Sequence, residues 1–141
     1  MLAASVLTGC QSKTSTDNPS SANISDSSVT DKSETKNSDG YRQVDAEEAK
    51  RIMDEETGYI ILDVRTEQEY SEGHIPGAVL LPDYEVSERA EELLSDKEQL
   101  ILVYCRSGNR SRGASAALAK LGYTNVVEFG GIRSWPYDIV T

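Results

Sequence analysis

The chain has 141 residues, of which 38% are hydrophobic, and a formal net charge of −10 at pH 7. This length supports one domain of ordinary size. The acidic balance argues against a nucleic-acid partner, because phosphate backbones bind clustered lysine and arginine side chains.

The N-terminal cysteine, Cys10, closes a small apolar stretch that begins at Met1. The segment Leu7-Thr8-Gly9-Cys10 resembles the lipobox of bacterial lipoproteins, in which the signal peptide is cut before the cysteine and the sulfur is lipidated. A signal peptide needs a basic segment before its apolar stretch, and none precedes this one, so we expect the natural start to lie upstream of Met1. The resemblance implies that residues 1–10 hold the end of a signal peptide with its lipobox. It also implies an extracytoplasmic protein that the lipid on Cys10 anchors to the bacterial cell membrane.

The next segment, residues 11–39, is almost entirely Ser, Thr, Asn, Asp and Lys, with Ile24 and Val29 as its large apolar side chains. Such a composition cannot bury enough surface to offset the entropy lost on ordering. We therefore predict a disordered polar tether here and a folded domain over residues 40–141, which is long enough for one modest core.

The folded part begins with two strand–helix pairs. Residues 41–44 favour a strand, and the acidic residues at the start of residues 45–53 are typical of a capped helix. The apolar run 59–64 has strand length and is interrupted by Asp63 near its end. The pattern Thr-x-x-Glu that opens residues 66–72 predicts a helix with a capping box, ended by a glycine.

The second half continues the same alternation. Residues 78–81 form a predicted strand closed by proline, and Ser87 is expected to cap the following helix. Residues 100–104 are a fourth strand, residues 111–121 an alanine-rich helix, and residues 125–129 a fifth strand. Uninterrupted apolar strands that alternate with helices predict an α/β fold: a mainly parallel sheet with helices on both faces.

The second cysteine, Cys105, is the most informative residue because it stands between the fourth strand and a short polar loop that leads into a helix. Unpaired N–H groups and the helix dipole favour an anion at such a position. A cysteine placed there ionises readily, and the thiolate is the nucleophilic form. Asp63 and Arg65 lie at the carboxyl end of another strand, so we expect them to face this site and to brace its rim.

Positive charge gathers in the sequence around this cysteine. Between positions 106 and 133, five basic residues accompany a single acid, Glu128: Arg106, Arg110, Arg112, Lys120 and Arg133. This pattern predicts a local positive field that attracts small anions. Arg106 and Arg110 would orient an anionic donor through charge-assisted hydrogen bonds.

Five motifs in this order resemble a single-domain rhodanese, a sulfurtransferase, over about residues 44–136. They are Asp63-Val64-Arg65, Glu69-Tyr70, Gly73-His74-Ile75-Pro76-Gly77-Ala78, Cys105-Arg106-Ser107-Gly108-Asn109-Arg110-Ser111 and Gly130-Gly131-Ile132-Arg133-Ser134-Trp135. The resemblance implies a five-stranded, mainly parallel sheet. It also implies that Cys105 takes sulfane sulfur from a donor such as thiosulfate and passes it, as a persulfide, to cyanide or a thiol.

The loop residues fit this chemistry. Backbone N–H groups of Arg106, Ser107, Gly108, Asn109, Arg110 and Ser111 can surround the terminal sulfur of a persulfide. Gly108 permits the tight turn that aims these groups inward. We expect His74 to serve loop structure and Trp135 to pack in the core. No cluster of His, Cys or Asp has metal-ligand spacing, so the sequence predicts neither a metal nor a cofactor.

Two other functions compete with this reading. A phosphatase or arsenate reductase of a related fold needs an arginine six positions after its cysteine, where this chain has Ser111; Arg110 comes one residue early. The loop therefore fits a single sulfur atom better than a tetrahedral phosphate. The other alternative is a tethered, non-enzymatic binding or sensing module with the same fold, which the presence of Cys105 disfavours.

Overall fold

A parallel sheet of five strands organises residues 35–141, the part of the chain that this computed structural model describes. Cys10 and the lipobox lie outside the described residues, as does the tether up to residue 34. The strands are β1 (Arg42–Gln43), β2 (Ile60–Asp63), β3 (Val79–Leu80), β4 (Ile101–Cys105) and β5 (Val126–Gly131). They lie in the order β1-β5-β4-β2-β3, and every neighbouring pair is parallel, which confirms the predicted sheet.

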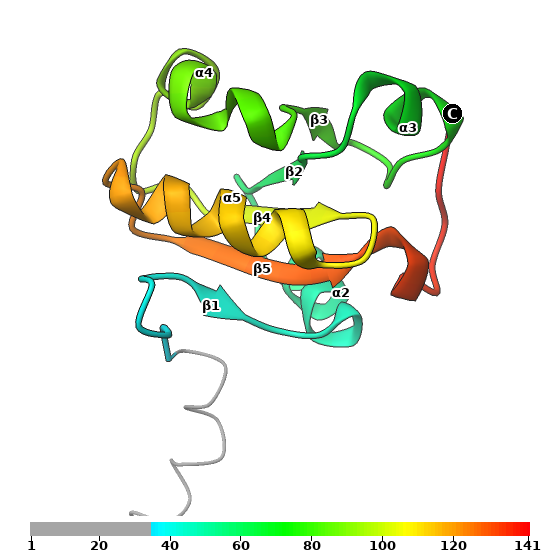
Figure 1. Cartoon of the computed structure of the whole chain (residues 1–141). Coiled ribbons are helices and arrows are strands. Elements are labelled where there is room, and N and C mark those ends of the chain that lie inside the picture. Colours follow the sequence, from blue (N-terminus) through cyan, green and yellow to red (C-terminus); the bar gives the residue numbers. More distant parts are fainter. Residues whose placement is uncertain (1–34) are drawn as a thin grey trace, which may run out of the picture. The chain divides into compact units, whose positions relative to one another are not determined.

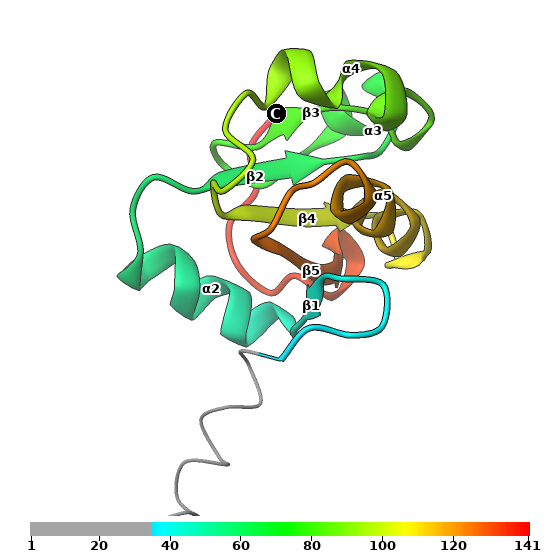
Figure 2. The ribbon, with the colours of Figure 1, turned by 90° about the vertical axis from the view of Figure 1, so that its left-hand side faces the viewer.

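The helices cover both faces of this sheet, as predicted (Figures 1 and 2). They are α2 (Ala46–Glu55), α3 (Glu67–Glu72), α4 (Val86–Leu93) and α5 (Asn109–Lys120), with short 3-10 turns η2 (Asp83–Glu85) and η3 (Ile132–Ser134). Figure 2 shows the sheet nearly edge-on, with α2 on one side and α5 on the other. Within residues 35–141, no helix has the length and apolar character needed to cross a bilayer.

Two hydrophobic cores, one on each face, hold these layers together. On the α5 face, Leu118 and Ala90 pack with strand residues such as Val103. On the α2 face, Ile52 and Trp135 pack with the opposite side of the same strands. The three inner strands, β2, β4 and β5, are mostly buried on both faces, which is the reason for their apolar sequences.

Local signals in the sequence set most element boundaries. Asp45 accepts a hydrogen bond from the Glu48 N–H at 2.8 Å and caps α2, as predicted. The helix runs beyond the expected end at residue 53, and Arg51 pairs with Glu48 and Glu55 along its exposed side. The capping box of α3 between Thr66 and Glu69 is also confirmed.

Two predicted helix starts are wrong. Ser87 does not cap α4, because turn η2 already directs the chain into a helix that begins at Val86 without a side-chain cap. Helix α5 begins at Asn109, two residues before the predicted start. Gly108 has a φ of +107°, and this conformation turns the chain from the loop directly into the helix. Ser111 therefore lies inside the first helical turn and not before it.

Residues 36–39, which the sequence assigns to the tether, form a turn beside the domain. The Asn37 N–H donates to the Tyr41 carbonyl at 2.9 Å, and Lys36 Nζ donates to the Thr124 carbonyl at 2.6 Å. Tyr41 itself is buried in the core on the α5 face.

Candidate active site

Cys105 is the last residue of β4, the strand at the centre of the sheet. It is 1% exposed, and it is the free cysteine of the described residues. Every residue of β4 is buried, so the strand fixes the sulfur firmly from the core side. The chain then turns through Arg106–Gly108 into α5, whose N-terminal end therefore faces the sulfur.

Two groups at the start of α5 contact the sulfur. The Gly108 N–H donates to Cys105 Sγ at 3.0 Å, and Ser111 Oγ lies 3.5 Å from Sγ. Unpaired N–H groups and the positive end of the helix dipole favour negative charge at this point. Of the loop amides that the sequence predicts around the sulfur, the Gly108 amide is the one seen bonded to Sγ; Ser107 and Asn109 are exposed. The arrangement suits a thiolate nucleophile.

The loop after Cys105 crosses directly over the end of β5. Cys105 is paired with Gly131 across the sheet, and the Arg133 N–H donates to the Arg106 carbonyl at 3.2 Å. A Cβ atom at Gly131 would collide with the backbone of Arg106 and Ser107. The missing side chain at position 131 therefore allows the loop to take its path beside the sulfur.

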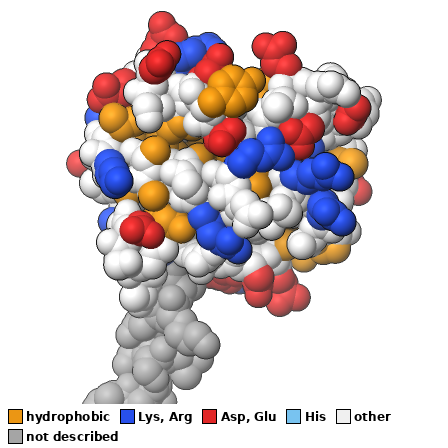
Figure 3. All heavy atoms as spheres, in the orientation of Figure 1, with side chains coloured by type: hydrophobic (Ala, Val, Ile, Leu, Met, Phe, Trp, Pro, Cys, Tyr) orange, Lys and Arg blue, Asp and Glu red, His pale blue; other side chains and the backbone are white. Residues whose placement is uncertain are grey.

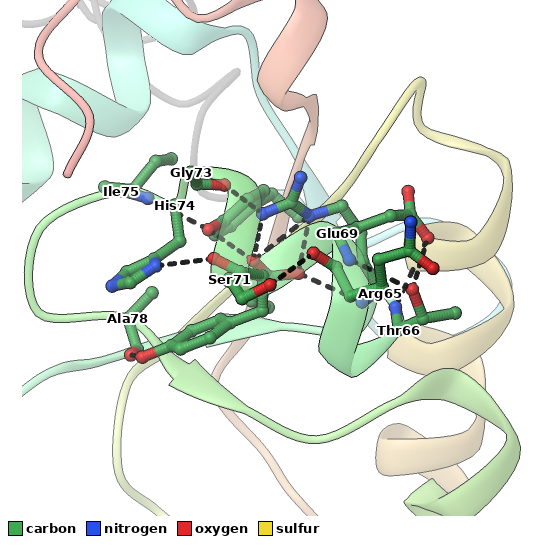
Figure 4. A network of polar contacts seen from close by, with 12 residues as sticks. Arg65, Thr66, Glu69, Ser71, Gly73, His74, Ile75 and Ala78 are labelled. Carbon is green, nitrogen blue, oxygen red and sulfur yellow. Dashed lines mark hydrogen bonds and ion pairs between the residues drawn. The ribbon is translucent and has the colours of Figure 1, made fainter. Parts of the chain in front are cut away.

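Asp63 and Arg65 form a buried ion pair at the carboxyl end of β2. Arg65 Nη2 lies 2.6 Å from Asp63 Oδ2 and also donates to the Gly73 carbonyl at 2.7 Å (Figure 4). Tyr104, which precedes the cysteine, donates its hydroxyl to Asp63 Oδ2 at 2.7 Å and accepts the Ile75 N–H at 3.1 Å. Burial, together with the bond to Asp63, raises the pKa of the Tyr104 hydroxyl, so this group stays protonated. The network ties β2, β4 and the 73–75 loop together beside Cys105.

Arg110 makes a two-pronged ion pair with Glu69 across the rim of the site. Its two guanidinium nitrogens each lie 2.9 Å from a Glu69 oxygen. The hydrogen bonds from Arg110, reinforced by those from Thr66, lower the pKa of Glu69 to about 2. The sequence predicts Arg110 as a donor-binding residue, whereas the structure places its guanidinium on a carboxylate that links α3 to α5.

A hollow of about 370 Å³ opens beside the loop. Its lining residues are Arg65, Glu69, Glu72, Gly73, Arg106, Ile132, Arg133 and Ile139. Arg65 and Glu69 are already paired, but Arg106 and Arg133 expose their side chains. Figure 3 shows basic side chains, with acidic ones among them, over the end of the molecule where α5 begins. The hollow can therefore admit a small anion next to the loop.

Arg133 and Glu69 line the hollow at the candidate site, and the sequence alone did not assign either residue to it. Arg133 was visible in the sequence as part of the basic cluster, but its distance from Cys105 along the chain hid its closeness to Arg106. Glu69 was visible as a helix-capping residue, and it does cap α3 while pairing with Arg110. Nothing local in the sequence indicates that Glu69 pairs with Arg110.

His74 and Trp135 have the structural roles that were expected. The His74 ring stacks on Tyr70 with 3.8 Å between ring centroids, and its Nδ1 lies 2.9 Å from the Tyr70 carbonyl oxygen (Figure 4). Its backbone forms an antiparallel bridge with Val140. Trp135 is 9% exposed and packs against Phe129. Within residues 35–141, no three His, Cys, Asp or Glu side chains are placed to hold a metal ion.

Comparison with known proteins agrees with this geometry. Residues 45–136 match the family model of the rhodanese-like domain. The thiosulfate sulfurtransferase PspE of Escherichia coli (strain K12) is 38% identical over 72 residues, which are 51% of this chain and 69% of PspE. A sulfurtransferase of Allochromatium vinosum is 34% identical over 94 residues, 66% of this chain and 86% of that protein. The protein YrkF of Bacillus subtilis (strain 168) is 36% identical over 102 residues, 72% of this chain, but the match spans only 54% of YrkF.

Solved structures give the same result. A rhodanese-related protein of Thermoplasma volcanium aligns with a TM-score of 0.62 and 32% identity, over 71% of this chain and 98% of that one. A structure titled "rhodanese with anions from E. coli" aligns with a TM-score of 0.56 and 34% identity, over 59% of this chain and 98% of that one. The matched segment holds four of the five parallel strands, the loop of Cys105 and the helix that faces its sulfur, so the chain belongs to the rhodanese-like domain family and is a rhodanese-like enzyme.

Proposed function

We propose that this protein moves sulfane sulfur from thiosulfate, or a similar anionic donor, to a thiophilic acceptor such as cyanide or a thiol, through a persulfide on Cys105. The observation that carries the proposal is the bond from the Gly108 N–H to Cys105 Sγ at 3.0 Å, at the N-terminal end of α5. This position stabilises negative charge on a thiolate and on the terminal sulfur of a persulfide.

The transfer divides into two steps. The Cys105 thiolate attacks the outer sulfur of thiosulfate, the sulfur–sulfur bond of the donor breaks, and sulfite leaves with the bonding electron pair. The terminal sulfur of the persulfide is then attacked by the acceptor, and the thiolate of Cys105 is regenerated. A covalent intermediate replaces one difficult transfer by two easier ones.

The hollow beside the loop supports binding of an anionic donor. Arg106 and Arg133 are exposed in it, and the hydrogen bond between their backbones keeps them adjacent. Arg110 is less available for this purpose because Glu69 holds its guanidinium. We assign donor binding to Arg106 and Arg133, with Asp63 and Arg65 as the support of the rim.

A phosphate-binding function is disfavoured by the same loop. The position six residues after the cysteine carries Ser111, whose side chain is buried beneath the loop. Arg110, which comes one position before Ser111, binds Glu69. Neither residue offers a free guanidinium for a tetrahedral oxyanion above Cys105.

The proposal is tested by the rate of thiocyanate formation from thiosulfate and cyanide. Cys105→Ser should reduce the rate to background with an unchanged circular dichroism spectrum, whereas Cys10→Ser should keep it. Mass spectrometry after thiosulfate treatment should show one added sulfur on the peptide that contains Cys105. Activity retained in Cys105→Ser, or hydrolysis of an aryl phosphate without any sulfur transfer, would contradict the proposal.

We further propose that the domain works outside the cytoplasm on a lipid anchor. The support is the motif Leu7-Thr8-Gly9-Cys10, which lies outside the described residues and is followed by a polar segment. Cells grown with a labelled fatty acid should label the parent protein but not Cys10→Ala. Label retained in that variant would refute the anchor.

A further inference from the structure

The hollow beside the loop of Cys105 is larger than the donor that we propose for it. Its volume is about 370 Å³, which falls within the range of sites for small organic molecules, about 300–1,000 Å³. Thiosulfate is an ion of five heavy atoms and fills only part of such a space. The hollow therefore has room for a second kind of substrate, and its lining indicates the chemistry of that substrate.

Three charged side chains of the lining have no ionic partner. Arg106, Arg133 and Glu72 are all exposed in the hollow. Within residues 35–141, none of the three forms an ion pair, and Glu72 accepts only a long hydrogen bond from Gln68 Nε2, at 3.4 Å. The other charged side chains of the lining are held by ion pairs with residues outside it. The hollow thus offers both positive and negative charge to one ligand.

The backbone fixes where these charges enter the hollow. The Arg133 N–H donates to the Arg106 carbonyl at 3.2 Å, which keeps the two arginines adjacent. Glu72 is the last residue of α3, and the carbonyl of the next residue, Gly73, accepts a hydrogen bond from Arg65 at 2.7 Å (Figure 4). Positive charge therefore comes from the loop after β4 and the turn after β5, and negative charge comes from the end of α3.

Two isoleucines supply an apolar part of the lining. Ile132 is half-buried, and Ile139 is 51% exposed. Ile139 is nevertheless held in place, because its neighbour Val140 exchanges two backbone hydrogen bonds with His74, of 2.7 and 2.8 Å. Its Cδ1 also lies 3.2 Å from the point that a Cβ at Gly73 would occupy. A short hydrocarbon segment of a ligand can pack against these side chains.

We propose that the hollow binds an α-amino-acid thiol, such as free cysteine, as the acceptor of sulfur from Cys105. The carboxylate of the ligand pairs with Arg106 and Arg133, and its ammonium group pairs with Glu72. The inference rests on the proposed function, because an acceptor is needed only where Cys105 carries a persulfide. Glu72, which has no role in that proposal, becomes a determinant of acceptor specificity.

The same arginines can serve donor and acceptor because sulfite leaves before the acceptor enters. The thiol sulfur of the amino acid then bonds to the terminal sulfur of the persulfide anion, and the bond from that sulfur to Cys105 breaks. Cys105 leaves as a thiolate with the bonding electron pair, and the proton of the acceptor thiol ends on the transferred sulfur. Over both steps, thiosulfate and the thiol give sulfite and the persulfide of the amino acid, with no other reagent.

Contacts to three groups on one carbon atom distinguish mirror images. The Cα of cysteine carries the carboxylate, the ammonium group and the methylene that leads to the sulfur. If the first two are held by fixed charges and the sulfur must reach Cys105, one enantiomer loses a contact. L-cysteine and D-cysteine have the same charge and the same thiol reactivity in solution, so a general electrostatic field treats them alike.

The test loads the full chain with thiosulfate, removes the excess and adds L-cysteine or D-cysteine. Mass spectrometry follows the loss of the added sulfur from the peptide that contains Cys105. The two enantiomers should differ about five-fold in their second-order rate constants, which is the upper range for one exposed ion pair. Glu72→Gln should slow the preferred enantiomer about five-fold and remove the difference between the two.

Three simpler thiols identify which charge each residue recognises. Cysteamine lacks the carboxylate, mercaptopropionate lacks the ammonium group, and mercaptoethanol lacks both. For each thiol, the ratio of the variant rate to the parent rate cancels the reactivity of the thiol itself. Glu72→Gln should slow cysteamine about five-fold without slowing mercaptopropionate or mercaptoethanol. Arg133→Gln should slow mercaptopropionate about five-fold without slowing cysteamine or mercaptoethanol.

Glu67→Gln is the matched control, because it removes the same charge from the exposed start of α3, outside the hollow. This variant should keep the parent rates with every thiol. Equal rates of the two cysteine enantiomers in the parent would overturn the inference, as would a Glu72→Gln effect that extends equally to mercaptoethanol. Both outcomes leave the proposed function intact, because the persulfide still forms and discharges. Failure to load sulfur on Cys105 would refute the proposed function, and this inference with it.

Discussion

Gly131→Ala should inactivate the protein while leaving it folded. The added Cβ would overlap the carbonyl carbon and oxygen of Arg106 and the nitrogen of Ser107, all of them backbone atoms that cannot rotate away. The backbone conformation at Gly131 is extended and available to any residue, so the cost comes from the collision alone. The loop has to move by more than about 1 Å to restore ordinary van der Waals separation.

The expected magnitudes separate the two consequences. Overpacking of this kind costs about 1–3 kcal/mol of unfolding free energy, less than the roughly 5–15 kcal/mol typical of a domain. A displacement of about 1 Å beside Cys105 should lower kcat/KM for thiosulfate about 100-fold. Activity should therefore fall far more than stability.

Initial rates of thiocyanate formation and urea unfolding curves on the same samples provide the assay. Gly113→Ala, on α5, is the matched control, because a Cβ there meets no atom within 4 Å. This control should keep full activity and gain about 1 kcal/mol from better helix propensity. If Gly131→Ala turned over thiosulfate at the parent rate, the argument that position 131 shapes the active-site loop would be wrong.

Other predictions concern the polar contacts of the site. Tyr104→Phe should lower the unfolding free energy by about 1–3 kcal/mol in urea titrations, because two buried partners lose its hydroxyl; an unchanged midpoint would contradict this. Glu69 has a folded-state pKa of about 2, below its usual value of 4.5, so its pairing stabilises the protein above pH 4.5 and is lost as the pH falls toward 2. Because the pair is partly exposed, Arg110→Ala should cost about 1 kcal/mol near neutral pH, and the difference from the parent should vanish near pH 2. Arg133→Ala should raise KM for thiosulfate about five-fold without changing kcat, and added salt should reduce this difference from the parent. An equal rise of KM in Lys120→Ala, at the far end of α5, would show a general effect of the protein's charge instead.

Local sequence patterns were sufficient for the fold class and for the place of Cys105 in the fold. Continuous apolar strands, capping residues and glycines are short-range signals, and each specifies structure within a few residues of itself. They correctly placed all five strands within two residues at each end and put Cys105 between a strand and a helix. They also identified Asp63 and Arg65 as neighbours at the end of an adjacent strand.

Contacts between distant elements were decided only by the tertiary structure. The pairing of Arg110 with Glu69 joins two helices. Hydrogen bonds link Glu128 on β5 to Cys105 on β4 through a serine on α5. A sequence states which side chains carry charge, but compensation between charges depends on which strands and helices become neighbours. The parallel order β1-β5-β4-β2-β3 brings the end of β5 beside the end of β4, and for this reason Glu128, Gly131 and Arg133 belong to the site of Cys105.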